Sequence, residues 1–502
     1  MDTLIIRADA SPAIGYGHVM RCLALAQAWQ DRGGRYVFLT SQPAPAIEAR
    51  LTSEGFAVLK LEATPGSRED ASELADSAAQ NDARWAVIDG YHFGLEYQQI
   101  LKSAGLKVLV IDDYGQIGAY AADIILDQNA GAREILYTHR EFATELLLGT
   151  RYAMLRREFK AWGEWKREIP PVARKILVTM GGSDPENLTA RVVEALRKLD
   201  LPEVEATIVI GGGNSNRSNI SNLIENAKPK PRLESDVHNM PELMAQADLA
   251  VASAGSTSWE ICLLRLPAIV VGAAPNQLPI AQALNAAEAA IHISKTTLTI
   301  DGLAEAIRSL ATSHDLRRKL STNAAKFVDG RGAARVVSAM YLPTIALRRA
   351  KPDDCRLLWE WATESAVRLA SFSPGPINWD EHQEWFQNKI DDPRCLILIA
   401  EDEHRRPLGQ VRADFSAHQD AEDAEIDISV SREHRGMGFG SRLISECVRE
   451  VFNRTKAERV HAFIRPENST SIQAFQKACF TSLGLDFVRG YQAFHYVRNR
   501  AS

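Results

Sequence analysis

The chain has 502 residues, with 58 basic and 64 acidic side chains and a formal net charge of −6. A chain of this length usually folds into more than one domain, each with its own hydrophobic core, so two or three domains are expected. The lack of a basic excess argues against nucleic acid as a partner, and no run of about eighteen apolar residues predicts a membrane span. The 6 scattered cysteines form no C-x-x-C pair and indicate reduced thiols in a cytoplasmic protein, and the first residues predict a strand instead of a signal peptide.

Short β-rich runs alternate with helical stretches through residues 1–165. The runs are LIIRAD, YVFLT, FAVLKL, WAVID and VLVID, and the first predicted helix covers roughly residues 17–32. The alternation restarts with KILVTM at 175–180 and continues through ATIVI, DLAVAS and AIVV within residues 166–342. Alternating strands and helices are typical of βαβ units, so each stretch predicts one domain with a parallel sheet.

The pattern changes after Leu342 and Pro343. Residues 343–502 begin with the strand TIALRRA and an amphipathic helix, and then carry the strands CLILIA, LGQVRADF, AEIDISV and VHAFIR. This order predicts a third domain, of mixed α/β class.

The first strand leads through Gly15-Tyr16-Gly17-His18 directly into a helix. Helix N-termini offer free N–H groups to anionic oxygen, and open α/β sheets bind ligands at the carboxyl ends of their strands. His18 is therefore the candidate general base of the first domain. The alternative is a tight turn in which His18 is only a cap residue.

Three further polar patches follow predicted strands of the first domain: Asp89 to His92, Asp112-Asp113, and Asp127 to Asn129. Each is a candidate for holding a sugar hydroxyl. For Asp112 and Asp113 individually, capping of the next turn is favoured, because aspartate commonly has that role at strand ends.

Two glycine loops lie between strands and helices of the second domain. Gly181 to Asn187 follows KILVTM, and Gly255-Ser256-Thr257 follows DLAVAS at the start of a helix that carries Glu260. Such turns supply N–H groups and hydroxyls to a pyrophosphate, and a carboxylate one helical turn away accepts ribose hydroxyls. The alternative is helix capping, with Ser or Thr at the N-cap and Glu in the first turn.

Residues 1–341 resemble the UDP-2,4-diacetamido-2,4,6-trideoxy-β-L-altropyranose hydrolases of pseudaminic acid biosynthesis. The matching stretches include RADASPAIGYGHVMRCLALA, IILDQN, LLGTRYAMLRREF, VTMGGSDPEN, NMPELMAQADLAVASAGSTSWEICLLRLP and PNQ. The resemblance implies two Rossmann-like domains in a GT-B-type (MurG-like) arrangement and no metal. It implies that His18 activates the water that displaces UDP, that Tyr91 and Asn276 lie near the sugar and diphosphate, and that the nucleotide side of the site comprises Gly17, Gly182, Ser183, Ser256, Thr257 and Glu260.

The strand AEIDISV runs into Arg435-Gly436-Met437-Gly438-Phe439-Gly440 and then a helix. Successive N–H groups in such a loop form a nest for a pyrophosphate. The loop resembles the R-x-x-G-x-G/A loop of GNAT acetyltransferases, and NSTSIQAFQKACF resembles a later helix of that family. The resemblance implies acetyl-CoA as co-substrate, bound by Ile428, Val430, Arg435, Gly436, Gly438, Phe439, Gly440 and Asn468.

Glu425 and Asp427 share one face of the AEIDISV strand, and Glu425 is the preferred general base for an acceptor amine. Two positions depart from the family pattern: Phe475 stands where a tyrosine acid is frequent, and Cys479 stands where glycine is usual. The general acid is therefore unassigned. Residues 347–364, 367–386 and 408–415 resemble acetyltransferases that act on UDP-4-amino sugars. The aromatic side chains of this region are candidates for an acceptor pocket or for core: Trp359, Trp379, His382 and Trp385.

Together the domains predict a bifunctional enzyme that N4-acetylates a UDP-4-amino sugar and then hydrolyses the UDP-diacetamido product. The expected partners are a UDP-sugar, water and acetyl-CoA, without nucleic acid or membrane. Two alternatives remain: a GT-B glycosyltransferase joined to an acetyltransferase, since this fold also transfers sugars to acceptors, and a nucleotide-sugar-binding protein with a degenerate GNAT domain.

Overall fold

The computed structural model describes residues 3–11, 14–42, 45–141, 144–199, 201, 203–227, 230–235, 237–341, 345–402, 405–415, 423–435 and 439–500. The chain divides into two compact units, Met1–Val337 and Ser338–Ser502, which we call the front unit and the rear unit. In the described ranges, no helix is both long enough and apolar enough to cross a membrane.

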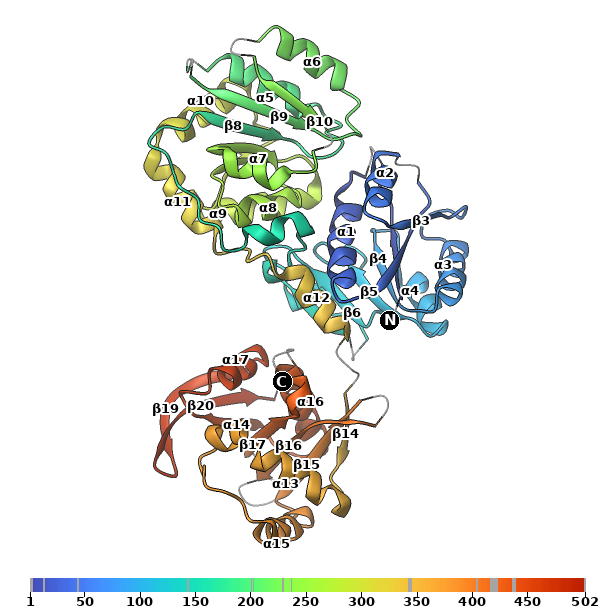
Figure 1. The fold of residues 1–502 in the computed structure, drawn as a ribbon, viewed down its shortest axis with the longest axis vertical. Coiled ribbons are helices and arrows are strands. Elements are labelled where there is room, and N and C mark those ends of the chain that lie inside the picture. The colour runs from blue at the N-terminus through green and yellow to red at the C-terminus, as the bar shows by residue number, and fades with distance from the viewer. Residues whose placement is uncertain are drawn as a thin grey trace. The chain divides into compact units, whose positions relative to one another are not determined.

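The first sheet of the front unit has seven strands in the order β3-β2-β1-β4-β5-β6-β7, all parallel (Figure 1). Its strands are β1 (Thr3–Ala8), β2 (Arg35–Thr40), β3 (Ala57–Lys60), β4 (Ala83–Asp89), β5 (Lys107–Ile111), β6 (Ile124–Asp127) and β7 (Glu145–Leu148). Its helices are α1 (Gly17–Gln30), α2 (Pro45–Ser53), α3 (Arg68–Gln80) and α4 (Leu95–Ser103). The order reverses between β1 and β4, which makes this the topological switch point where open α/β sheets bind ligands.

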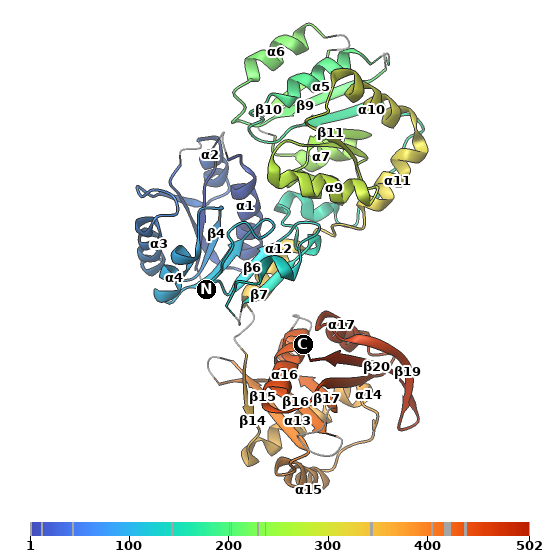
Figure 2. The ribbon, with the colours of Figure 1, turned by 180° about the vertical axis from the view of Figure 1, so that it is seen from behind.

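The second sheet has six strands in the order β10-β9-β8-β11-β12-β13, again all parallel. They are β8 (Lys175–Thr179), β9 (Glu205–Ile210), β10 (Arg232–Ser235), β11 (Leu249–Ser253), β12 (Ala268–Gly272) and β13 (Ile291–Ser294). The helices are α5 (Leu188–Arg197), α6 (Arg217–Glu225), α7 (Met240–Gln246), α8 (Thr257–Leu263), α9 (Leu278–Ala286), α10 (Ile300–Thr312) and α11 (His314–Ala324), and they cover both faces of the sheet (Figure 2). The following helix, α12 (Gly332–Tyr341), lies instead against residues 151–153 of the first domain. Here the order reverses between β8 and β11.

Helices on both faces of a parallel sheet bury its strands completely, which explains why those strands are continuous apolar runs. Leu4, Ile5 and Ile6 in β1 are fully buried, as are Leu249 and Val251 in β11. The predicted pair of Rossmann-like domains is confirmed. The four-residue strands β6, β7, β10 and β13 were not predicted, whereas β3, which is equally short, lies within the predicted run FAVLKL.

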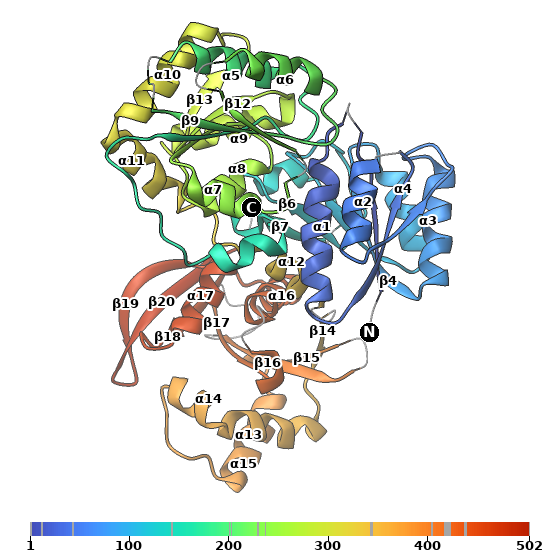
Figure 3. The same cartoon turned by 45° about the horizontal axis from the view of Figure 1, so that its top comes forward.

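The rear unit has a mixed sheet of seven strands in the order β14-β15-β16-β17-β18-β20-β19 (Figure 3). The strands are β14 (Ala346–Arg349), β15 (Cys395–Glu401), β16 (Pro407–Phe415), β17 (Asp423–Val430), β18 (Arg459–Ile464), β19 (Thr481–Val488) and β20 (Tyr491–Asn499). The helices are α13 (Cys355–Thr363), α14 (Ser365–Ala370), α15 (Trp379–Ile390), α16 (Phe439–Arg454) and α17 (Ser469–Lys477).

Neighbouring strands of this sheet are antiparallel except β17 and β18, whose parallel pairing covers only Asp423 to Glu425. Beyond Glu425, β17 has no backbone partner on its β18 side within the described residues. One face of the sheet packs on α16, with Ala424, Ile426 and Val460 in its core. Because side chains alternate along a strand, Glu425 and Asp427 point to the opposite face.

Candidate functional site

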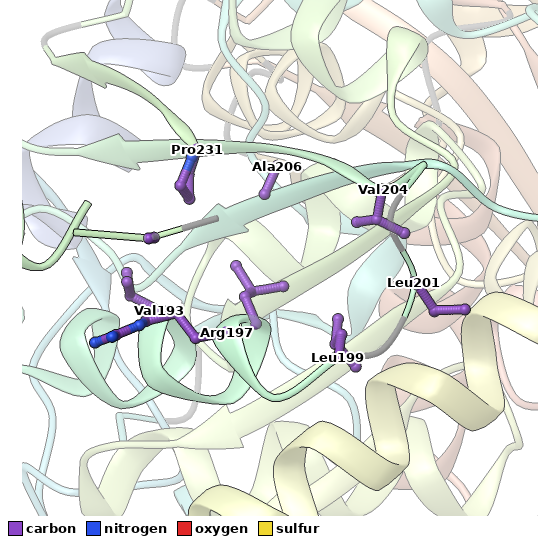
Figure 4. Close-up of a pocket in the computed structure, with 9 residues that line it drawn as sticks. Val193, Arg197, Leu199, Leu201, Val204, Ala206 and Pro231 are labelled. Atoms are coloured by element: carbon purple, nitrogen blue, oxygen red, sulfur yellow. The ribbon is translucent and has the colours of Figure 1, made fainter. Parts of the chain in front are cut away.

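A cleft of about 730 Å³ in the front unit is lined from both switch points. His18, which follows β1, and Gly182 and Ser256, which follow β8 and β11, all line it. This volume is within the range of small-molecule and cofactor sites. A second hollow, between α5 and the β9 side of its sheet, is lined by residues such as Val193, Leu201 and Val204 (Figure 4), but its volume of about 20 Å³ leaves no room for more than water.

His18 lies in the first turn of α1, and its Nδ1 is 2.6 Å from Oδ1 of Asp89. Asp89 is the last residue of β4 and is buried. A carboxylate accepts the Nδ1 proton, so Nε2 of His18 is the ring nitrogen with a free lone pair. The ring also meets Tyr91 edge-on, with centroids 5.3 Å apart. From the sequence, His18 was the candidate general base and Asp89 was a candidate for holding a sugar hydroxyl; in the structure Asp89 instead contacts the histidine ring.

Arg21 lies one helical turn after His18 and is held between two buried carboxylates. Its Nε and Nη2 each lie 2.7 Å from Asp89, and its Nη1 and Nη2 lie 2.8 and 3.1 Å from Asp113. Burial by itself would raise the pKa of both carboxyl groups, but the guanidinium outweighs burial and holds each below its usual range. The site thus contains a fixed network of two anions and one permanent cation.

Asp113 corrects an interpretation made from the sequence, where turn capping was favoured for both Asp112 and Asp113. Asp112 does accept the backbone N–H groups of Asp113 and Gln116. Asp113 instead lines the cleft and accepts hydrogen bonds from Arg21 and Tyr91. Asp112 and Asp113 are adjacent and chemically identical, so the sequence does not show which of the two side chains points into the cleft.

Tyr91 and Asn276 lie together although they come from different domains of the front unit. The Tyr91 hydroxyl donates to Oδ2 of Asp113 at 2.8 Å and accepts from Nδ2 of Asn276 at 2.9 Å. Burial and the Asp113 charge raise the pKa of Tyr91 well above its usual range, so the hydroxyl stays protonated. The structure therefore brings together the three residues predicted near the sugar. His18 contacts Asp89 and Tyr91 contacts Asp113, while Asn276 contacts the Tyr91 hydroxyl.

The glycines of the second domain admit the Tyr16 ring. A Cβ atom built on Gly182 would lie 2.6 Å from that ring, and one built on Gly213 would overlap its hydroxyl end. Gly17 faces the Ser256 hydroxyl, since a Cβ at Gly17 would lie 3.9 Å from Oγ. The predicted residues Gly17, Gly182, Ser183, Ser256 and Thr257 all line the cleft. Because glycine has no side chain, the loop that carries Tyr16 can approach the loops of the second domain closely.

Glu260 lines the same cleft, and its Oε1 accepts a hydrogen bond of 2.7 Å from Nη2 of Arg156. Burial raises the pKa of Glu260, against the opposing effect of Arg156. The Ser256 side chain accepts no capping hydrogen bond at the start of α8. Capping is therefore not the role of Ser256, whereas in the other glycine loop Asp184 accepts the N–H groups of Leu188 and Thr189 and does cap α5. Arg156, which the sequence left without a role, lies in the LLGTRYAMLRREF stretch.

In the rear unit, Arg435 lies at the predicted coenzyme loop. Its Nε donates to the Val430 carbonyl at 2.8 Å and its Nη1 pairs with Glu364 at 2.7 Å. Its Nη2 is buried and has no hydrogen-bond partner among the described residues. Gly436 and Gly438 lie outside the described residues. Phe439 is buried at the start of α16, and a Cβ on Gly440 would make only ordinary contacts, with Ala474 and Val430.

Ile428 and Val430 lie on the part of β17 that has separated from β18. Asn468 caps α17, where its side chain accepts the Ser471 N–H at 3.1 Å. Phe475 is buried against Phe480, and Cys479 has a φ of 61°, the left-handed conformation that explains why glycine is usual there. Phe475 thus belongs to the core.

Glu425 is exposed on β17, opposite Asp414 of β16. Partial desolvation, followed by the charge of Asp414, raises the pKa of Glu425 above its usual range. A carboxyl group with a raised pKa is a better proton acceptor than an ordinary surface glutamate. Asp427 instead lies 3.5 Å from Arg412.

The aromatic residues considered for an acceptor pocket pack on one another. Trp359 and Trp379 have centroids 5.5 Å apart, and His382 lies between Trp379 and Trp385. His382 is buried and its Nε2 is 3.2 Å from the Cys355 carbonyl. This packing is that of a structural cluster joining α13 and α15.

Two family models match the chain. Residues 175–336 match the glycosyltransferase family 28 C-terminal domain, and residues 344–481 match the acetyltransferase (GNAT) domain. Groups of three or more His, Cys, Asp or Glu side chains able to hold a metal ion do not occur among the residues whose positions are described.

An uncharacterized protein of Methanocaldococcus jannaschii is 24% identical and covers 95% of this chain and 96% of its own length. The UDP-2,4-diacetamido-2,4,6-trideoxy-β-L-altropyranose hydrolase of Campylobacter jejuni is 28% identical over 52% of this chain and 88% of its own length. The spore coat polysaccharide biosynthesis protein SpsG of Bacillus subtilis is 25% identical over 67% of this chain and 96% of its own.

Among solved structures, Acinetobacter baumannii MurG is 17% identical and covers 67% of this chain and 98% of its own length, with a TM-score of 0.48. Spermidine N-acetyltransferase from Vibrio cholerae, in complex with CoA and spermine, is 20% identical and covers 31% of this chain and 95% of its own, with a TM-score of 0.29. Together, the sheet orders and the two family models show that a front unit of GT-B, glycosyltransferase-like architecture is joined to a GNAT acetyltransferase domain.

Proposed function

We propose that the chain is a bifunctional nucleotide-sugar enzyme. The rear unit transfers acetyl from acetyl-CoA to the 4-amine of a UDP-4-amino-2-acetamido sugar. The front unit hydrolyses the product, UDP-2,4-diacetamido-2,4,6-trideoxy-β-L-altropyranose, to UDP and the free sugar. The observation that carries the proposal is His18, oriented by Asp89, in one cleft with Ser256, Thr257 and Glu260.

The relatives support joining the two steps. The Campylobacter jejuni protein that matches the front half is named as the hydrolase, and the Methanocaldococcus jannaschii protein matches along both halves. The rear-unit product would be the front-unit substrate, so one chain would carry consecutive reactions.

For hydrolysis, Nε2 of His18 takes a proton from water while the water oxygen attacks the anomeric carbon. The bond between that carbon and the β-phosphate oxygen breaks, and UDP leaves. Asp89 stabilises the imidazolium that forms, as the aspartate does in a catalytic triad. Tyr91 and Asn276 hold the sugar against His18, and the hydroxyls of Ser256 and Thr257 donate to the diphosphate.

Arg156 gives a test of the nucleotide side of this proposal. Because Arg156 fixes one oxygen of Glu260, the other oxygen is positioned to accept the ribose hydroxyls. Arg156→Leu leaves Glu260 buried without its cation, so we expect UDP to bind about 10- to 100-fold more weakly. We also expect the variant to lose the preference for UDP over 2′-deoxy-UDP, measured by calorimetry of both nucleotides.

The neighbouring arginine is the matched control for Arg156. Arg157 contacts Gln27 and Gln30 instead of the cleft. Arg157→Leu should keep the affinity and the preference. Retained discrimination in Arg156→Leu, or equal losses in the two variants, would remove Glu260 from the ribose site.

For acetyl transfer, three features support a coenzyme at the end of β17. At Ile428 and Val430, β17 no longer pairs with β18, so the backbone N–H and C=O groups on that edge are available to a ligand. Nη2 of Arg435, which has no hydrogen-bond partner among the described residues, is a donor for a diphosphate, and Glu425 is the last residue of β17 that pairs with β18. Because Phe475 has no proton to donate, the departing thiolate takes its proton from solvent.

Replacing Glu425 tests the base of this second reaction. Glu425→Gln should lower kcat/KM for acetyl transfer about 100-fold at neutral pH, the effect of losing one general base. In the wild type, the rise of kcat/KM with pH should reflect a pKa above the ordinary glutamate value, and this rise should vanish in the variant. Asp427→Asn is the comparison on the same face of β17, and a larger loss there would transfer the role to Asp427.

A further inference from the structure

Gln128 and Asn129 follow strand β6 at the carboxyl edge of the first sheet, and both line the cleft that contains His18. Their exposed fractions are only 1% and 2%. Asp127, the residue before them, accepts the backbone N–H of Asn129 at 3.0 Å and the Tyr137 hydroxyl at 2.8 Å. The start of this loop is therefore fixed, and the hydrolysis proposed above gives its two amide side chains no role.

Each of the two amide side chains has one end held by the protein. Oε1 of Gln128 accepts the backbone N–H of Met154 at 2.8 Å, and Nδ2 of Asn129 donates to Oδ1 of Asp113 at 2.6 Å. These partners fix the direction of each amide, because a backbone N–H only donates and a carboxylate only accepts. The other ends are Nε2 of Gln128, a donor, and Oδ1 of Asn129, an acceptor. Among the described residues neither of these two atoms has a hydrogen-bond partner, and both retain solvent access on the cleft side.

A free donor next to a free acceptor is the complement of an acetamido group. Such a group has one N–H donor and one C=O acceptor, which point in opposite directions. When it lies between the two side chains, its carbonyl accepts from Nε2 of Gln128 and its N–H donates to Oδ1 of Asn129. A protonated amine has only donors, so it would leave the buried donor of Gln128 without a partner. Sites reject a ligand in this way when the ligand lacks the partner of a buried polar group.

The hydrogen-bond network indicates which substituent of the sugar reaches this loop. Arg21 contacts both His18 and Asp113, so Arg21 and Asp113 lie between the histidine and Asn129 in the network. In the proposed hydrolysis His18 acts at C1 of the sugar. C2 is bonded to that carbon, whereas C4 lies across the ring from it. The position of Asn129 therefore favours the group on C4 over the group on C2.

We propose that Gln128 and Asn129 bind the 4-acetamido group of the nucleotide sugar, so that the front unit hydrolyses the acetylated sugar and rejects its 4-amino precursor. The proposal rests on the function proposed above and adds the residues that determine its specificity. These residues make and break no bond. Their selection places acetyl transfer before UDP release, because the free amine is a poor ligand for the cleft.

The test compares two substrates of the full chain without acetyl-CoA. For the wild type, kcat/KM for UDP release should be at least about 100-fold higher with the UDP-diacetamido sugar than with the UDP-4-amino sugar. Gln128→Glu keeps the oxygen that Met154 uses and replaces the free donor by an acceptor, which repels the acetyl carbonyl and attracts an ammonium group. The ratio of the two kcat/KM values should therefore fall about 100-fold. Because both values come from one preparation, a partly unfolded preparation leaves the ratio unchanged.

Gln116→Glu is the matched control. It makes the same change at an exposed position in the loop after β5, and Gln116 does not belong to the described residues that line the cleft. This variant should keep the wild-type ratio. A wild type that hydrolyses both sugars equally well, or a Gln128→Glu variant with the wild-type ratio, would overturn the proposal.

A crystal structure of the His18→Ala chain with the UDP-diacetamido sugar gives a readout that needs no hydrolysis. The 4-acetamido group should lie within hydrogen-bond distance of Nε2 of Gln128 and Oδ1 of Asn129, and any other position of that group would overturn the proposal. A wild type that hydrolyses neither sugar would instead overturn the proposed function, while the complex would still test the two amide side chains.

Discussion

His18→Ala is expected to reduce UDP release by at least about 10³-fold while acetyl transfer continues at the wild-type rate. The reason is that Nε2 of His18 is the free nitrogen of a ring whose other nitrogen is held by Asp89 at 2.6 Å. Among the described residues that line the cleft, the other histidine is His238, which contacts Arg50 instead of Tyr91. The measurement follows UDP and the acetylated intermediate by mass spectrometry in one reaction.

Asp89→Asn is the companion variant, because it keeps the shape of the side chain and removes its charge. An amide can present a hydrogen to Nδ1 and leave the wrong nitrogen facing the water, so we expect a loss of about 10²- to 10⁴-fold. Full UDP release by His18→Ala would remove the histidine from the mechanism. Release that requires an added acceptor sugar would favour the glycosyltransferase alternative.

Arg21→Leu is expected to destabilise the front unit by about 3–5 kcal/mol, the usual effect of removing one partner from a buried ion pair. The substitution leaves Asp89 and Asp113 buried and close together without their shared cation. The measurement is hydrogen exchange of the β1 and β4 amide groups in urea. Arg32→Leu, at an exposed position just beyond α1, should have little effect.

The effect of Arg21→Leu should depend on pH in a definite direction. In the wild type, the depressed pKa values of Asp89 and Asp113 contribute stability above the unfolded carboxyl pKa of about 3.9, and this contribution is lost as pH falls through the folded values. In the variant, burial dominates and the folded pKa values rise, so protonation stabilises the folded state. The two proteins should therefore differ most at neutral pH and least below about pH 4. A difference that is constant with pH would contradict this reading of the network.

The loops that follow strands could be predicted from the sequence, because a strand, a glycine turn and a helix start are local patterns. His18, Ser256 and Glu260 were predicted in this way, and all three line the cleft. The contacts between the charged residues of the site could not be predicted, because the partners are distant in the sequence: Arg21 reaches Asp89 across 68 positions and Asp113 across 92, and Arg156 reaches Glu260 across 104. Only the fold brings these charges together.

The rear unit shows the same limit. The coenzyme loop and Glu425 follow from a local pattern, whereas Arg435 and its partner Glu364 are 71 positions apart and only the fold brings them together. Strands β19 and β20 were not predicted, and β19 is largely exposed on both faces, so it lacks the one-sided burial that usually marks a strand.

The central claim is that water activated by His18 attacks the anomeric carbon of a nucleotide-bound sugar. The most direct measurement incubates the full chain with UDP-4-amino-4,6-dideoxy-L-AltNAc and acetyl-CoA in H₂¹⁸O and follows the products by mass spectrometry. The predicted result is a UDP-diacetamido intermediate, followed by free sugar and by UDP that contains no ¹⁸O. Recovery of ¹⁸O in UDP, which requires attack at phosphorus, or an intermediate that is never hydrolysed, would contradict the claim.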